Sequence, residues 1–217
     1  MLFRSFFTHS PSDMLLLWEA LGHDTGKEES STLGVPDPLQ EVEPEMAAGF
    51  AMTLSVLRKK GVAVQHVKMG DMLDKLANEN ELIMFYEGAQ FHKQRYEQYG
   101  SRLEDMAKLV EDGLKISPER YQEAMRYVAG CKLQVSEMMK ATPVILTPAA
   151  PGPAPLGLSS TGNAKMNAPW TALGTPAISI PMPMPSGLPL GLQITADRGQ
   201  EARVLRTAVR LQSILGA

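Results

Sequence analysis

The sequence predicts an α/β fold, and three observations lead to this prediction. A helical pattern that starts at Pro44 ends at Lys59-Lys60-Gly61, and a β-prone run at 62–67 follows, which makes a helix–turn–strand unit. Residues 142–195 hold eleven of the sixteen prolines and only one charged residue, with short apolar runs between the prolines. Residues 199–215 carry an apolar stripe at helical spacing, which predicts a closing amphipathic helix.

The N-terminal residues predict a short capped helix. Ser10 stands as its N-cap, Pro11 falls in the first turn, and Asp13 supplies an acidic side chain three residues after the cap. The run Met-Leu-Leu-Leu-Trp from position 14 is apolar throughout, and Gly22 is expected to end the helix. Residues 24–44 are acidic and rich in Ser, Gly and Pro, so we expect a surface loop there with a short strand at 32–35.

Residues 70–140 are helical in pattern almost throughout. Apolar and aromatic side chains recur at helical spacing, and Gly100 and Gly113 are the expected breaks. Ser117-Pro118 marks the start of another helix, which runs to about residue 140.

The proline-rich stretch predicts buried strands joined by long ordered loops. Proline is excluded from helix interiors and cannot donate to a strand ladder, and a flexible linker would normally carry more charge. The apolar runs at 144–146, 177–180 and 190–195 are the expected strands, with the last two adjacent to each other. Because long ordered loops are often functional, we place the candidate site in this stretch.

Composition excludes several classes of protein. A net charge of -3, a pI near 5.8 and scattered basic residues give no reason to expect a nucleic acid or an anionic membrane as partner. No apolar run approaches the roughly 20 residues of a membrane span. Cys131 is the only cysteine, so no intrachain disulfide can form, and we expect a buried inert thiol in a cytoplasmic protein.

Three blocks of the proline-rich stretch resemble the C-terminal part of the amidase signature family. They are Leu-Thr-Pro at 146–148, Ala-Pro-Trp-Thr-Ala-Leu-Gly-Thr-Pro-Ala-Ile-Ser-Ile-Pro at 168–181, and Gly-Leu-Pro-Leu-Gly-Leu-Gln at 187–193. The order and spacing of the blocks make the match more specific than any single block. Phe6-Phe7-Thr8 and Ser12-Asp13-Met14 are similar to the segment that follows the family's catalytic stretch.

The resemblance implies a fold and a reaction. It implies that residues 1–217 form a single partial amidase domain, part of an α/β/α fold in which helices flank a mixed sheet and whose N-terminal half is missing. Within that domain, residues 70–140 are expected to form a peripheral helical layer, 142–195 the strand and loop core, and 199–215 the closing helix. The family hydrolyses carboxamide C–N bonds, without a cofactor, using a serine nucleophile, a second serine in a cis peptide and an upstream lysine.

The family's catalytic residues have no counterpart in these 217 residues. Its serines lie near a Gly-Gly-Ser-Ser-Gly stretch, and no such stretch occurs in the sequence. We therefore expect the chain to contain no catalytic residue and to be inactive alone. A small-molecule amide would be its substrate only after completion by the missing half.

Four residues are candidates for substrate binding. Trp170 and Thr171 lie where the family's chain passes near the acyl pocket, and core packing is the alternative for Trp170. Ser160 and Thr161 are uncharged hydroxyls in the long loop, and a turn that binds local backbone is the alternative for them. Lys165 is either a base of lowered pKa or, as we favour, a solvent-facing ammonium.

Other patterns indicate no chemistry. The four histidines are far apart and show no metal-binding spacing, and there is no phosphate-binding glycine loop. Ser30-Ser31 lies in an acidic loop and is expected to be solvated. The rival hypothesis is a non-catalytic binding or assembly protein that keeps the half-fold and pairs with a partner chain or as a homodimer. In that case the bare sheet edge must be covered.

Overall fold

The computed structural model describes residues 5–26, 32–184 and 187–216 of the chain. The helices are α1 (Pro11–Ala20), α2 (Pro44–Lys59), α3 (Met72–Tyr99), α4 (Asp105–Gly113), α5 (Pro118–Ala141), α6 (Ala168–Leu173) and α7 (Glu201–Leu215), with short 3₁₀ helices η1 (Gly100–Leu103) and η2 (Ala164–Met166). The strands are β1 (Thr32–Asp37), β2 (Ala63–Lys68), β3 (Val144–Pro148), β4 (Ala177–Pro181) and β5 (Gly191–Ala196). All the strands expected from the sequence are present.

The strands of the described residues form one mixed sheet in the order β2-β1-β3-β5-β4. β1 runs parallel to both β2 and β3, while β5 runs antiparallel to β3 and to β4. The sheet therefore has β2 at one border and β4 at the other. The predicted mixed α/β sheet flanked by helices is confirmed.

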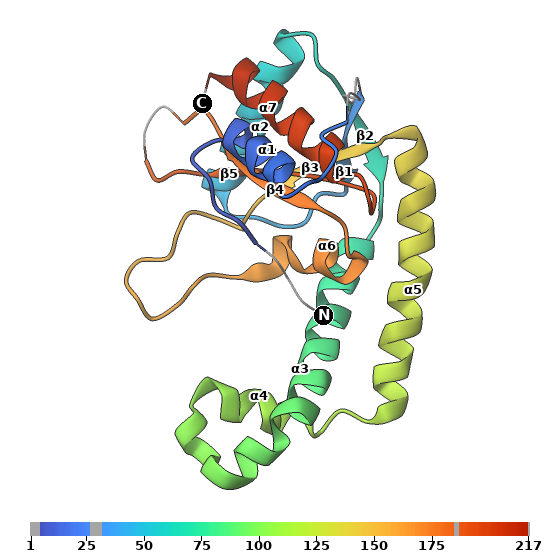
Figure 1. Ribbon diagram of the computed structural model, residues 1–217, viewed down its shortest axis with the longest axis vertical. Helices are drawn as coiled ribbons and strands as arrows, with labels where there is room; N and C mark the ends of the chain where they lie inside the picture. Colours follow the sequence, from blue (N-terminus) through green and yellow to red (C-terminus); the bar gives the residue numbers. More distant parts are fainter. Residues whose placement is uncertain (1–4, 27–31, 185–186, 217) are drawn as a thin grey trace.

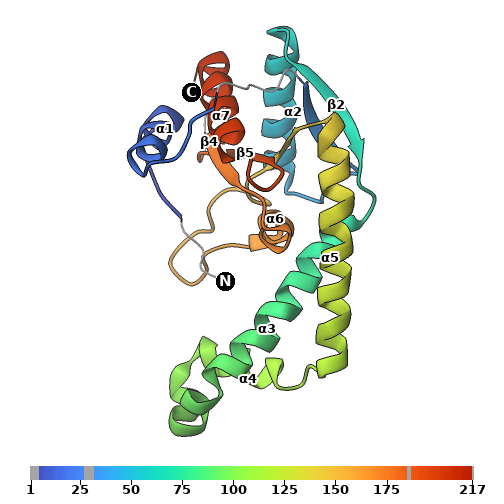
Figure 2. The same cartoon turned by 45° about the vertical axis from the view of Figure 1, so that its right-hand side comes forward.

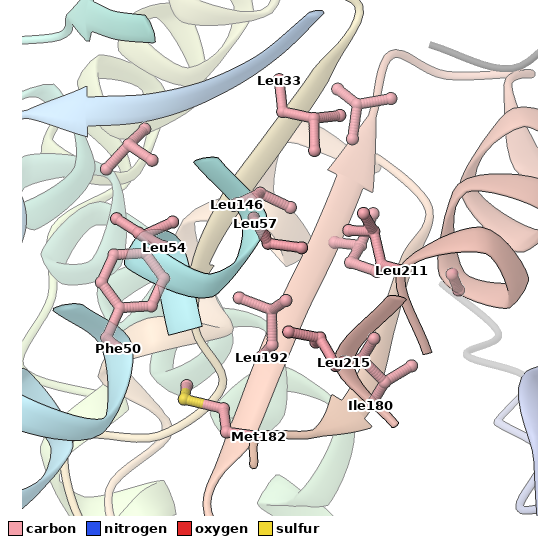
Figure 3. Close-up of a cluster of buried hydrophobic side chains, with 14 of the residues drawn as sticks. Leu33, Phe50, Leu54, Leu57, Leu146, Ile180, Met182, Leu192, Leu211 and Leu215 are labelled. Atoms are coloured by element: carbon pink, nitrogen blue, oxygen red, sulfur yellow. The ribbon is translucent and has the colours of Figure 1, made fainter. Parts of the chain in front are cut away.

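Helices α2 and α7 cover one face of the sheet and bury its larger apolar core (Figure 3). Figure 3 shows Phe50, Leu54 and Leu57 of α2 facing the sheet, with Leu211 of α7 on the other flank of Leu192. Leu146 and Leu192 are fully buried between the helices and the strands. Burying a side chain of this size contributes about 1.5–3 kcal/mol, so this core dominates the stability of the fold.

The opposite face of the sheet is covered by α6, the first turns of α3 and the last turns of α5. A second cluster joins Ile145 of β3 to Leu73 and Leu76 of α3, Val135 of α5 and Trp170 of α6. Neighbouring residues in a strand point to opposite faces, so Ile145 enters this cluster while Leu146 enters the first one. Both faces of β3 are therefore buried, and the domain has three layers.

The rest of α3 and α5, together with α4, extends away from the sheet as a helical arm (Figures 1 and 2). The breaks expected at Gly100 and Gly113 are confirmed, since α3 ends at Tyr99 and α4 ends at Gly113. The close approach of α4 to α3 depends on Gly113, because a Cβ atom there would lie 2.1 Å from the carbonyl oxygen of Phe85. The assignment of the whole chain to one partial domain stays a prediction.

The helix starts follow the expected capping chemistry. The Oγ of Ser10 accepts a hydrogen bond from the backbone N–H of Asp13 at 3.1 Å, and the Oγ of Ser117 accepts one from the N–H of Arg120 at 3.2 Å. Both helices place proline directly after the cap, where its missing N–H costs nothing. Each cap satisfies a backbone N–H in the first turn of its helix.

Candidate functional site

A long loop at residues 149–167 connects β3 to α6, and its base is held tightly. The side-chain amide of Asn167 donates to the carbonyl oxygen of Ala149 at 3.2 Å, which closes the two ends of the loop. Gln193 of β5 is 3% exposed, and its Nε2 donates to Thr147 Oγ1 at 3.0 Å and to the carbonyl oxygen of Met166 at 3.2 Å. The loop therefore leaves and rejoins the sheet at fixed points.

The tip of this loop is exposed and carries two of the predicted site residues, Ser160 and Thr161. The Oγ of Ser160 accepts a hydrogen bond from the N–H of Gly162 at 3.1 Å, which is the local turn contact expected from the sequence. Leu156 and Leu158 on the same tip are fully exposed. A substrate-binding role for Ser160 and Thr161 stays a prediction, because in the described chain they face solvent.

Lys165 does not stand free in solvent, as the sequence alone suggested. Its Nζ lies 3.2 Å from Asp74 Oδ1 on α3, and the Nε2 of Gln40 donates to the same oxygen at 3.1 Å. The lysine side chain is 31% exposed. These contacts tie η2 to α3, so Lys165 holds the loop in place, and its contact is a carboxylate and not a serine hydroxyl.

Trp170 and Thr171 are neighbours in the short helix α6, and they differ in burial. Trp170 is 1% exposed and packs in the second cluster, and its indole Nε1 has no hydrogen-bond partner among the described residues. Thr171 is half-buried and lines a hollow on the outer side of α6. The structure therefore brings Thr171 to a concave surface and places Trp170 behind it as support.

This concave surface, which we call the α1–β4 hollow, has a volume of about 1300 Å³. One wall is α1 with the residues that precede it, and the other is β4 with the end of α6 and the start of α7. Its lining comprises residues 5–11, Met14, Trp18, Leu21, His23, Thr171, residues 174–181, residues 189–191, Glu201, Val204 and Leu205. The sequence did not reveal the hollow, since it depends on how far α1 stands from the sheet.

Three polar side chains of the hollow, those of Trp18, His23 and Thr175, are used to build its walls. The ring of His23 stacks on Trp18 with centroids 3.9 Å apart, and the indole Nε1 of Trp18 donates to the carbonyl oxygen of Asp24 at 3.2 Å. The hydroxyl of Thr175 donates to the carbonyl oxygen of Trp170 at 3.3 Å, and the Oγ1 atoms of Thr195 and Thr175 lie 3.2 Å apart. These contacts shape a surface and do not form a nucleophile–base pair.

Cys131 is buried in the second cluster, as expected. Burial raises the pKa of its thiol, and this effect outweighs the lowering caused by the hydrogen bond with Tyr127 and by the Lys75 ammonium. The ammonium of Lys75 lies 4.3 Å from the centroid of the Tyr127 ring. A thiol with a raised pKa in an apolar cluster is a poor nucleophile, so the geometry assigns Cys131 to the core.

Neither a metal centre nor a membrane span is formed by the described residues. No group of three or more His, Cys, Asp or Glu side chains is placed to hold a metal ion in this part of the chain. Every helix of residues 5–26, 32–184 and 187–216 is too short or too polar to cross a lipid bilayer. The serine pair at 30 and 31 lies outside the described residues.

Comparison with known proteins identifies the fold. The family model described as amidase matches residues 23–205, which is most of the chain. The chain belongs to the amidase family. The amidase resemblance found in the Leu-Thr-Pro, Ala-Pro-Trp-Thr and Gly-Leu-Pro blocks is therefore confirmed.

Solved structures reproduce the amidase fold over nearly the whole chain. A crystal structure of an amidase superposes with a TM-score of 0.85 and 24% identity, over 96% of this chain and 52% of that chain. The structure of 6-aminohexanoate cyclic dimer hydrolase complexed with substrate superposes with a TM-score of 0.69 and 19% identity, over 99% of this chain and 50% of that chain. The chain thus spans about half the length of these structures.

A sequence relative adds a shorter match. A glutamyl-tRNA(Gln) amidotransferase subunit of Tropheryma whipplei is 33% identical over 103 residues, which cover 44% of this chain and 20% of that protein. At these identities the solved structures establish the fold, while the family assignment rests on the family model over residues 23–205.

Proposed function

We propose that this chain is the C-terminal part of an amide hydrolase and supplies scaffold and pocket wall to its active site. The observation that carries the proposal is the amidase-family match over residues 23–205, combined with a fold that accounts for nearly all of this chain and about half of a solved amidase. In this proposal, hydrolysis of a carboxamide C–N bond uses a Ser-cisSer-Lys set that lies outside these 217 residues.

The residues of this chain would then bind and orient the substrate. Thr171 faces the hollow and offers a hydroxyl to a polar group of the amide, while Trp170 fixes the position of α6 from behind. The loop that carries Ser160 and Thr161 is anchored at its base by Gln193, so its tip can be placed against a substrate once the remaining half is in position. A serine hydroxyl is activated only by a base in hydrogen-bond reach, and that pair is assigned to the remaining half.

The activity prediction can be tested on the purified chain. We expect no covalent labelling by a serine-reactive fluorophosphonate and no release of ammonia from a panel of short, aryl and fatty amides. Labelling that maps to a serine of this chain would refute the assignment of the catalytic groups to the remaining half. Coexpression with the N-terminal part of the Tropheryma whipplei protein, which would carry those groups, is expected to restore labelling on the added chain and not on this one.

The second candidate is a non-catalytic binding or assembly protein, and the exposed side chains of Leu16 in α1 and Leu21 directly after it favour it. The reading frame upstream of the codon for Met1 discriminates between the two. A lysine followed by a Gly-Gly-Ser-Ser-Gly stretch in that frame would establish an enzyme, and a frame without them would favour the binding protein. A cytoplasmic location stays a prediction in both cases.

A further inference from the structure

The outer half of α3, away from the sheet, carries an apolar face that no described element covers. Met84 is 50% exposed, and Phe91, seven residues further along, is 77% exposed. Seven residues span about two turns of a helix, so the two side chains lie on the same face, which we call the Phe91 face. Apolar side chains of this size are stabilised by burial, and the described chain does not provide it for them.

The other sides of this part of α3 are already packed. A Cβ atom at Gly88 would lie 2.6 Å from Leu109 Cδ2, so α4 lies close against α3 there. Tyr86 stacks on Tyr121 of α5 with ring centroids 4.3 Å apart. At about 100° per residue, these two contacts lie on either side of the Phe91 face and leave it open.

Two opposite charges flank Phe91 at equal spacing. Glu87 lies four residues before it and Arg95 four residues after it, and both side chains are exposed. On a helix, a charge pairs with a residue three or four positions away. Those positions hold no basic residue for Glu87 and no acidic residue for Arg95. The Glu87 carboxylate accepts a hydrogen bond from the Tyr121 hydroxyl at 2.9 Å, and neither it nor the Arg95 guanidinium forms an ion pair within the described chain.

A second copy of this chain would supply the missing partner of each charge. In two antiparallel α3 helices that cross at Phe91, a twofold axis places Glu87 of each copy opposite Arg95 of the other. Each charge then lies four residues, or about 6 Å, from the crossing point, a distance over which helices packed at about 20° stay in contact. Phe91 meets its own counterpart at the axis, and Met84 lies opposite Gln98 of the other copy. We propose that two copies of the chain associate through the Phe91 face of α3.

The charge pattern selects a second copy over another kind of partner. A face that carries opposite charges at positions equally far from its centre is complementary to itself, which is what an isologous interface requires. The arm extends away from the sheet, so the sheet does not block the approach of a second arm (Figures 1 and 2). The residues that line the α1–β4 hollow lie outside 72–141, so association through the arm is independent of the proposed function.

The test is sedimentation velocity of the purified chain over a series of concentrations at low salt, with the variants Glu87→Arg and Arg95→Glu. Either reversal alone places like charges in both contacts of a homodimer, so we expect the dissociation constant to rise roughly tenfold or more. An equimolar mixture of the two variants has attractive charges in both contacts of the mixed pair. That mixture should form a heterodimer with the affinity of the wild-type dimer.

A matched control separates the contact from a general effect of charge. Glu97→Arg changes the net charge by the same amount as Glu87→Arg but lies off the Phe91 face, so it should leave the dimer unchanged. Thermal melting checks that each variant is folded. Because the mixed pair is made of the same two chains as the weakened homodimers, its recovery cannot come from restored folding.

A wild-type chain that stays monomeric at every concentration would overturn the inference. So would a mixture of the two variants that associates no better than either variant alone. Hydrogen exchange gives a third readout: slowed exchange around Phe91 only in a complex with the N-terminal part of the Tropheryma whipplei protein would assign the face to the other half of the fold instead.

Discussion

Replacing Gln193 by methionine removes the donor that anchors the base of the 149–167 loop, and the structure sets the size of the effect. Nε2 makes two buried hydrogen bonds, to Thr147 Oγ1 and to the carbonyl oxygen of Met166. Each bond contributes about 1 kcal/mol net, and a buried carbonyl left without a donor costs about 1–3 kcal/mol. Methionine nearly preserves the volume, so the polar loss dominates, and we expect the free energy of unfolding to fall by about 3 kcal/mol.

The assay is urea unfolding of the 217-residue chain, followed by tryptophan fluorescence, with thermal melting alongside. A loss of about 3 kcal/mol corresponds to a lowering of Tm by roughly 6–12 °C for a chain of this size. The matched control is Gln122→Met on the exposed side of α5, where a change within about 0.5 kcal/mol is expected. If the two variants unfold at the same urea concentration, Gln193 does not anchor the loop and the reasoning fails.

The remaining predictions concern the arm and the core. Gly113→Ala places a Cβ atom 2.1 Å from the Phe85 carbonyl oxygen and should lower the free energy of unfolding by about 1–3 kcal/mol. The control is Gly130→Ala, which has open space around it and should raise the free energy of unfolding by about 0.5–1 kcal/mol. Urea melts that rank the two variants the other way would contradict the α3–α4 contact. Because burial raises the pKa of Cys131, less of it is thiolate at pH 8 than for a free cysteine. Iodoacetamide should therefore label the native chain much more slowly than the urea-unfolded chain. Equal labelling rates would show that the thiol is exposed. Ser117→Ala should cost about 1 kcal/mol by removing the cap of α5, and an unchanged urea midpoint would argue against that cap.

Much of the fold could be predicted because its signals are local. Ser10 and Ser117 cap helices through bonds to residues three positions on, and proline with uncharged apolar runs identified β3, β4 and β5. The parallel and antiparallel pairing could not be read in this way, since it depends on which strands meet across the sheet. The family resemblance implied a mixed sheet, and the order of its strands comes from the structure alone.

The candidate site was predicted less completely, and the reasons are contacts between distant parts of the chain. Tryptophan buries a large area in a core or in a pocket, so only its neighbours show that Trp170 supports α6 from inside. Lys165 is the only charged residue in residues 142–195, so the sequence does not show its partner Asp74, which lies on α3. Gln193 closes the Gly-Leu-Pro block of the sequence, yet its anchoring role appears only when β5, β3 and η2 come together.

Helix α1 depends both on its own cap and on contacts with distant parts of the chain. Ten residues are fewer than the roughly 12–15 that an isolated helix needs, so its cap alone cannot hold it. It is kept in place by packing on α7, and the following loop is held by Arg206, whose Nε donates to the carbonyl oxygen of Thr25 at 2.6 Å. This fixes the C-terminal end of α1. Met14, Leu15, Leu17 and Trp18 are half-buried, whereas Leu16 is exposed. The contact with α7 and the Arg206 bond therefore hold a helix that its own length and cap do not.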